Sequence, residues 1–75
     1  MRPLHEIARE IRADWEKPYF GALPYIKAMF YVTDLDESFG YDDGRAVVRY
    51  FLANAGTWRG ETARKIKKEL NDMLK

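Results

Sequence analysis

The stretch 4-LHEIAREIRADW-15 places its apolar residues at spacings of three and four along the chain. These residues are Leu4, Ile7, Ala8, Ile11 and Trp15. Charged residues occupy the other positions, and Pro3 suits the first turn of a helix. The pattern predicts an amphipathic helix that ends before Pro18, because proline clashes with the preceding turn. Such a helix must bury its apolar stripe against other elements, so we expect a helical domain.

Two further helices follow in the middle of the chain. The segment 18-PYFGALP-24 holds two prolines and a glycine, which predicts a fixed turn before a helix from Pro24 to about Val32. Asp42 can cap a third helix that runs to about Ala53. A strand at 46-AVVRYFL-52 remains the alternative, because neighbouring valines lower helix propensity.

A fourth helix completes the expected fold. The residues 54-NAG-56 predict that the third helix ends at a glycine C-cap, and Thr57 is the expected N-cap of the last helix. The apolar stripe of that helix consists of Ala63, Ile66, Leu70, Met73 and Leu74. We also expect two ion pairs along it, Glu61 with Lys65 and Lys65 with Glu69.

Length and composition limit the fold to one domain. The chain has 75 residues, 47% of them apolar and 15% aromatic, which can fill a dense core in a small protein. We therefore expect residues 1–75 to form a single all-α domain, a compact bundle of about four short helices. The expected core residues are Leu4, Ile7, Ile11, Trp15, Met29, Phe51, Ile66 and Leu70.

The same composition excludes several classes of protein. The absence of cysteine excludes disulfides and thiolate metal sites. No apolar run is long enough to span a bilayer, so we expect a cytoplasmic protein without a membrane partner. The net charge of +1 argues against strong non-specific binding to nucleic acid, although the middle of the chain is acidic and the C-terminal half basic.

The acidic segment 34-DLDESFGYDDG-44 raises the question of a calcium site, because it holds five carboxylates. The residues that match ligand positions 1, 3 and 5 of an EF-hand loop are Asp34, Asp36 and Ser38. Phe39 stands where the loop needs glycine, and Arg45 stands where it needs a bidentate glutamate. We therefore predict a solvated loop and no metal site.

No catalytic arrangement is evident in the sequence. The lone histidine, His5, lies on a charged helix face, and Ser38 has no histidine near it in the sequence. The glycines form neither a dinucleotide-binding nor a phosphate-binding motif. The sequence thus predicts a non-enzymatic protein without a cofactor or a small-molecule substrate.

Aromatic and basic residues supply two sets of candidate binding residues. The candidate protein-interface residues are Trp15, Tyr19, Phe20, Tyr25 and Trp58, since exposed aromatic side chains are common interface anchors. The alternative for these rings is that they fill the core. The candidate nucleic-acid residues are Arg59, Arg64, Lys67 and Lys68 on the last helix.

Several segments resemble a family of small proteins from actinobacteriophages and related bacteria. They are 14-DW-15, 19-YFGALPY-25 with 28-AM-29, 51-FLANAGTWRG-60 and 63-ARKIKKEL-70, which together span most of the chain. The family has no assigned activity, so the resemblance implies a phage-related origin and a compact fold. It implies no mechanism.

Two functions remain open from the sequence. The first is a protein-interaction module, phage-encoded as the resemblance implies, that acts on a host protein or self-associates through 18-PYFGALP-24 and the second helix. The second is a nucleic-acid-binding module that uses the basic last helix. Gly56, Gly60 and Ile66 fit the spacing of a helix-turn-helix motif only loosely. The acidic segment would also repel the phosphates of a nucleic acid. We favour the protein partner.

Overall fold

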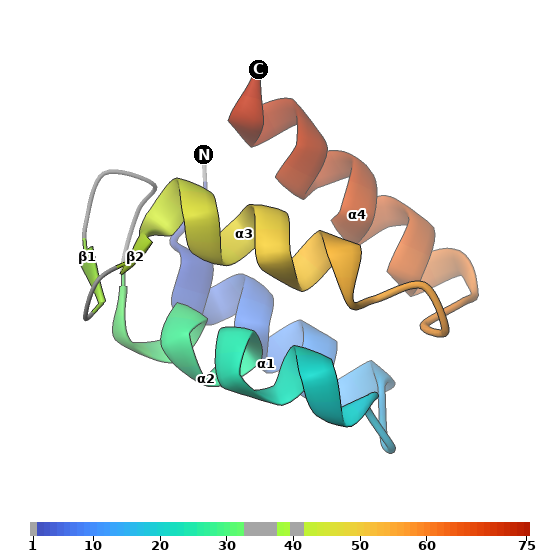
Figure 1. Ribbon diagram of the computed structural model, residues 1–75. Helices are drawn as coiled ribbons and strands as arrows, with labels where there is room; N and C mark the ends of the chain where they lie inside the picture. Colours follow the sequence, from blue (N-terminus) through green and yellow to red (C-terminus); the bar gives the residue numbers. More distant parts are fainter. Residues whose placement is uncertain (1, 33–37, 40–41) are drawn as a thin grey trace.

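The computed structural model describes residues 2–32, 38–39 and 42–75. Four α-helices form most of the described chain: α1 (Leu4–Asp14), α2 (Leu23–Tyr31), α3 (Gly44–Ala53) and α4 (Glu61–Leu74) (Figure 1). A short 3-10 helix, η1 (Phe20–Ala22), leads directly into α2. Two short strands, β1 (Ser38–Phe39) and β2 (Asp42–Asp43), pair antiparallel immediately before α3. The predicted all-α fold is confirmed.

Each helix packs against two others. Helix α1 contacts α2 and α4, and helix α3 also contacts α2 and α4, so the contacts close a ring around one core. Figure 1 shows α2 and α4 on opposite sides of α3. The radius of gyration of 11.0 Å confirms a compact bundle. No helix in the described residues is both long enough and apolar enough to cross a membrane.

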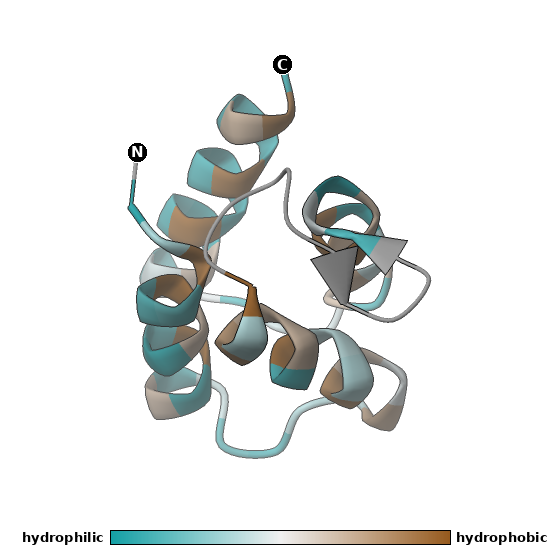
Figure 2. Cartoon of the chain, turned by 90° about the vertical axis from the view of Figure 1, so that its left-hand side faces the viewer, coloured by the Kyte–Doolittle hydropathy of each residue, from teal (hydrophilic) through white to brown (hydrophobic). Residues whose placement is uncertain are grey.

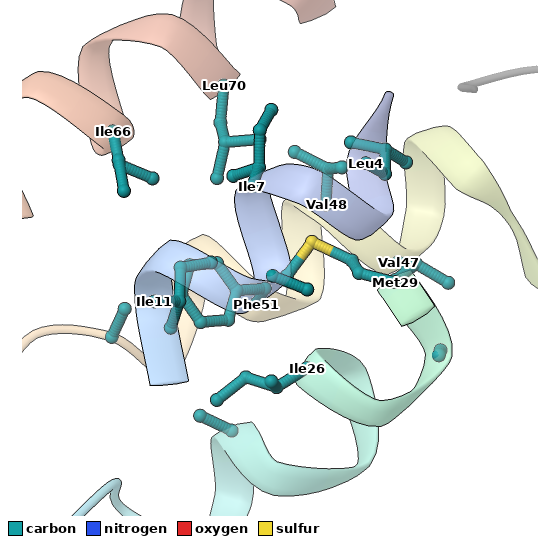
Figure 3. Packing of buried hydrophobic residues seen from close by; sticks show 14 of the residues in the cluster. Leu4, Ile7, Ile11, Ile26, Met29, Val47, Val48, Phe51, Ile66 and Leu70 are labelled. Carbon is teal, nitrogen blue, oxygen red and sulfur yellow. The ribbon is translucent and has the colours of Figure 1, made fainter. Parts of the chain in front are cut away.

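The core collects apolar side chains from all four helices. Figure 2 shows the apolar side of each helix turned toward the interior. In Figure 3, side chains of α1, α2, α3 and α4 meet around Met29 and Phe51, which are fully buried. All eight expected core residues are buried, so that prediction is confirmed. The described residues contain no buried polar or charged side chain.

Three aromatic rings close the end of the core where α1 stops. Trp15 stacks on Trp58, and both rings make T-shaped contacts with the ring of Phe51. The indole Nε1 of Trp58 donates a hydrogen bond to Asp14 Oδ2 at 2.8 Å. Trp58 is 2% exposed, so this contact fixes the connection between α3 and α4 against the end of α1.

Two ionic contacts join Arg2 in the N-terminal segment to α1 and α4. Arg2 donates two hydrogen bonds to Glu69, from Nε at 2.9 Å and from Nη2 at 2.6 Å, and it also pairs with Glu10. These hydrogen bonds raise the pKa of Arg2 and lower the pKa of Glu69, although burial of Glu69 opposes its shift. Glu69 therefore pairs across the fold, and the expected helical pair with Lys65 does not form.

The boundaries of α3 correct two predictions. Residues 46–52 lie within α3, so the alternative strand is wrong. Asp43, and not Asp42, is the N-cap: its Oδ1 accepts a hydrogen bond from Ala46 N at 2.8 Å. Asp42 instead belongs to β2, and this pairing moves the start of the helix one residue further along the chain.

The connection to α4 corrects two further predictions. Helix α3 ends at Ala53, and its C-cap is Asn54, whose backbone N–H and side-chain amide both donate to the carbonyl of Tyr50, so no glycine C-cap is used. Helix α4 begins after Gly60, and not after Thr57. Gly60 has a φ of 113°, which is incompatible with a helix. A helix that starts at Thr57 and continues through Gly60 therefore cannot form. The apolar stripe of α4 is confirmed by buried Ala63, Ile66 and Leu70.

Candidate interaction surface

The outward side of η1 and α2 is almost entirely apolar. Its exposed residues are Phe20, Leu23, Pro24, Lys27, Phe30 and Tyr31, which we name the aromatic face. Phe20 is 75% exposed and Tyr31 is 64% exposed. Lys27 is the only charged residue in residues 20–31. Contiguous exposed apolar surface of this kind is typical of sites that bind another molecule.

The local sequence makes this exposure unavoidable. The inward side of the same segment is also apolar, and it buries Ala22, Ile26 and Met29 in the core. A helix has room for only one inward stripe in a bundle of this size, so apolar residues on the other side must face solvent. Phe20, Leu23 and Phe30 recur at intervals that place them on that outer side.

The turn before α2 fixes the position of the first two rings. The ring centroids of Tyr19 and Phe20 are 4.8 Å apart. Gly21 makes this arrangement possible: a Cβ atom there would lie 2.6 Å from Tyr19 Cε2 and 2.7 Å from Asn54 Oδ1. A side chain at position 21 would therefore displace the Tyr19 ring or the Asn54 amide.

A shallow groove runs beside the aromatic face, between α1 and α2. Its volume is about 300 Å³, and Leu23, Ile26 and Phe30 form its apolar lining. Arg12 from α1 and Lys27 from α2 complete the lining, whose surface is almost entirely apolar. The groove can thus accept an apolar side chain of a partner beside two positive charges.

A larger hollow of about 500 Å³ lies along α4. Its described lining residues are Lys65, Lys68, Glu69, Asp72 and Met73. Three of these four charged residues already have partners, because Lys68 pairs with Asp72 at 3.0 Å and Glu69 pairs with Arg2. The pairing with Lys68 also lowers the pKa of Asp72. This hollow therefore offers a partner little unpaired charge.

The five candidate interface residues separate into three groups. Tyr19 and Phe20 are exposed; Phe20 belongs to the aromatic face, and the ring of Tyr19 lies beside it. Tyr25 is partly buried, and its ring lies 5.4 Å from that of Tyr50 on α3. Trp15 and Trp58 lie in the core and are absent from this surface. Sequence reasoning missed Leu23 as a surface residue, although its spacing from Phe20 and Phe30 gives the signal.

The four basic candidate residues, of which Arg59 precedes α4, do not form one free cluster. Lys67 donates from Nζ to the Trp58 carbonyl at 2.6 Å, and its Nζ lies 6.0 Å from the Trp58 ring centroid. Burial lowers the pKa of Lys67, with a smaller contribution from the charge of Arg59. Lys68 is paired with Asp72. Arg59 and Arg64 are exposed.

Metal-ligating side chains do not cluster in the part of the chain that the structure describes. His5 is partly buried on α1, and no group of three or more metal-ligating side chains occurs in residues 2–32, 38–39 and 42–75. Asp34 and Asp36, two of the three residues weighed as calcium ligands, lie outside the described residues. Comparison with known proteins adds no constraint, since no family model, curated protein or solved structure matches this chain.

Proposed function

We propose that this protein is a small, non-enzymatic protein-interaction module that binds its partner through the aromatic face. One observation carries the proposal: the outer side of η1 and α2 exposes five apolar residues and one lysine, in a protein whose inner core is already complete. Burial of such a surface drives most protein association. The resemblance to small actinobacteriophage proteins favours a host protein as the partner.

The rigidity of the face supports this proposal. Phe20 sits in a turn bounded by Pro18 and Pro24, and its ring packs against Tyr19. Leu23 and Phe30 lie on a helix that is anchored by Ile26 and Met29 in the core. Side chains held in this way lose little conformational entropy on binding, which favours affinity.

Site-specific photo-crosslinking in the producing cell tests this function directly. A photoreactive phenylalanine derivative replaces Phe20 or Phe30 on the aromatic face, or Arg49 or Arg64 on α3 and α4 as matched exposed controls. We expect discrete protein adducts from the first pair only. Adducts that form equally from all four positions, or from none, would show that the aromatic face is not an interface.

The alternative function, nucleic-acid binding, keeps fewer free cations than the sequence suggested. Lys67 and Lys68 are engaged with a carbonyl and a carboxylate, which leaves Arg59 and Arg64 exposed. Two phosphate contacts give a weak complex with a shallow salt dependence. The test is binding to duplex DNA. Loss of that binding in Arg64→Glu with Lys68→Glu, and its retention in Phe20→Ala, would favour this alternative.

A further inference from the structure

The two cations that border the groove between α1 and α2 are not engaged in the ionic contacts of the fold. Arg2, Lys68 and Lys75 each pair with a carboxylate, and Lys67 is bonded to a carbonyl. Arg12 and Lys27, by contrast, form no ion pair with any described residue. Both are exposed, so their charges are available to a second molecule.

The position of these charges matters because of what lies between them. Arg12 projects from α1 and Lys27 from α2, and both share a groove with Leu23, Ile26 and Phe30. A side chain that fills the groove would exclude water from this apolar lining. Electrostatic attraction strengthens where water is excluded, so carboxylates beside that side chain would be held more firmly than on open surface.

We infer that the partner is an acidic, amphipathic protein segment, which inserts one large apolar side chain into this groove and sets carboxylates beside Arg12 and Lys27. The inference rests on the proposed function and specifies the chemistry of the partner. A basic segment would bring like charges against both cations, which disfavours it. A neutral apolar segment would leave both cations facing its apolar side chains without partners.

The inference also explains how the face selects among partners. The apolar residues supply surface to bury, but burial alone does not distinguish one apolar partner from another. Two cations beside the groove, one on α1 and one on α2, favour a partner that carries carboxylates next to its apolar side chain. Arginine adds a planar fork that can hold a carboxylate with two hydrogen bonds, whereas lysine acts as a point charge.

Fluorescence anisotropy with designed peptides tests the inference. The probe is a fluorescein-labelled peptide with leucines at helical spacing between glutamates, and a matched peptide carries lysine in place of every glutamate. We expect the wild-type protein to bind the glutamate peptide at low salt, more weakly as salt increases, and to ignore the lysine peptide. Equal binding of the two peptides, or no binding of the glutamate peptide, would overturn the inference.

Two double variants with the same net charge identify the cations that act. Arg12→Glu with Lys27→Glu reverses the charge beside the groove. Arg49→Glu with Arg64→Glu reverses the charge at two exposed positions on α3 and α4. We expect the groove variant to weaken binding of the glutamate peptide by about tenfold or more, and the control to change it less than about twofold. Equal losses in both variants would refute a specific role for the groove. Circular dichroism first confirms that both variants are folded.

The result separates this inference from the proposed function. If crosslinks form at Phe20 and Phe30 but the groove variant binds the glutamate peptide as tightly as the wild type does, the acidic partner is wrong and the interaction function stands. If crosslinks fail, the interaction function itself falls. Sedimentation of the wild-type protein adds one further outcome. A dimer that dissociates in the groove variant would identify a second copy of this chain as the occupant and overturn the assignment of a separate partner.

Discussion

The indole rings of Trp15 and Trp58 lie face to face, with 5.7 Å between their centroids and 12° between their planes. Trp15 follows the end of α1, and Trp58 lies in the connection that precedes α4. The hydrogen bond from Trp58 to Asp14 holds the two rings in register. One aromatic contact therefore connects the first and last helices through residues that are distant in the sequence.

The first prediction concerns this hydrogen bond. Asp14→Ala should lower the free energy of unfolding by about 1–2 kcal/mol, because the indole N–H of Trp58 loses its charged acceptor in a partly buried position. Urea unfolding measures the loss. In a Trp58→Phe background, which lacks the donor, the same substitution should cost clearly less. Equal costs in both backgrounds would mean that the hydrogen bond contributes nothing.

The second prediction compares two glycines. Gly21→Ala should destabilise the protein by about 1–2 kcal/mol, since the new Cβ would collide with Tyr19 and Asn54. Gly56→Ala is the matched control, because a Cβ there meets no atom within 4 Å and the residue does not have a positive φ. The control should leave stability unchanged or raise it by about 0.5 kcal/mol. Identical melting temperatures for the two variants would contradict the close approach at Gly21.

The third prediction concerns the start of α4. Gly60→Ala should cost about 1–3 kcal/mol, because a φ of 113° with an extended ψ is a conformation that only glycine adopts readily. Space is not the cause, since a Cβ at Gly60 would meet no atom within 4 Å. Thermal unfolding of the variant gives the cost, and a melting temperature equal to that of the wild type would show that α4 starts differently.

The fourth prediction uses one substitution at two positions. Leu70→Ala should lower the free energy of unfolding by about 2–4 kcal/mol, because Leu70 is fully buried and its truncation leaves a cavity. Leu23→Ala removes the same atoms from a side chain that is 42% exposed, so it should cost less than about 1 kcal/mol. Ile11→Ala, also fully buried, should resemble Leu70→Ala. A costly Leu23→Ala would place that residue in the core.

The fifth prediction follows from the ion pair between Arg2 and Glu69. Arg2 holds the pKa of Glu69 below its ordinary value of 4.5, so folding favours the ionised carboxylate. The stabilisation is therefore present above about pH 4.5 and is lost as pH falls through the lowered pKa. In Glu69→Gln, the melting temperature should fall less steeply on acidification below that pH than in the wild type.

The control for that experiment is Glu6→Gln. Glu6 is exposed on α1 and forms no ion pair among the described residues, so its removal should leave the steepness of the acid-induced decrease unchanged. If the melting temperatures of Glu69→Gln and Glu6→Gln fall equally steeply on acidification, the pair with Arg2 does not link stability to pH.

The helices and their core could be predicted because periodicity reports burial directly. Leu4, Ile7 and Ile11 recur on one side of α1, and no other arrangement of that segment buries all three. The helix boundaries depended on contacts between distant segments. Thr57 is a suitable N-cap by composition, but burial of Trp58 and the backbone angle of Gly60 move the start of α4 to Glu61.

The candidate site was predicted less completely, for a reason of geometry. The local sequence does not distinguish an aromatic residue that packs inward beside a helix end, as Trp15 does, from one that projects outward, as Phe20 does. Only the positions of the neighbouring helices decide between these outcomes. The groove depends on them in the same way, because Arg12 and Lys27 come from different helices.

The pairing of Arg2 with Glu69 has a consequence for the order in which the chain folds, because these two residues are 67 positions apart. Helices α1 and α2 can meet after closure of a short loop, whereas α1 meets α4 only when nearly the whole chain closes. The entropic cost of closure grows with loop length, so we expect the first pair of helices to assemble early and the ionic contact late. Substitutions between α1 and α2 should then slow folding, while loss of the Arg2 contact should chiefly accelerate unfolding.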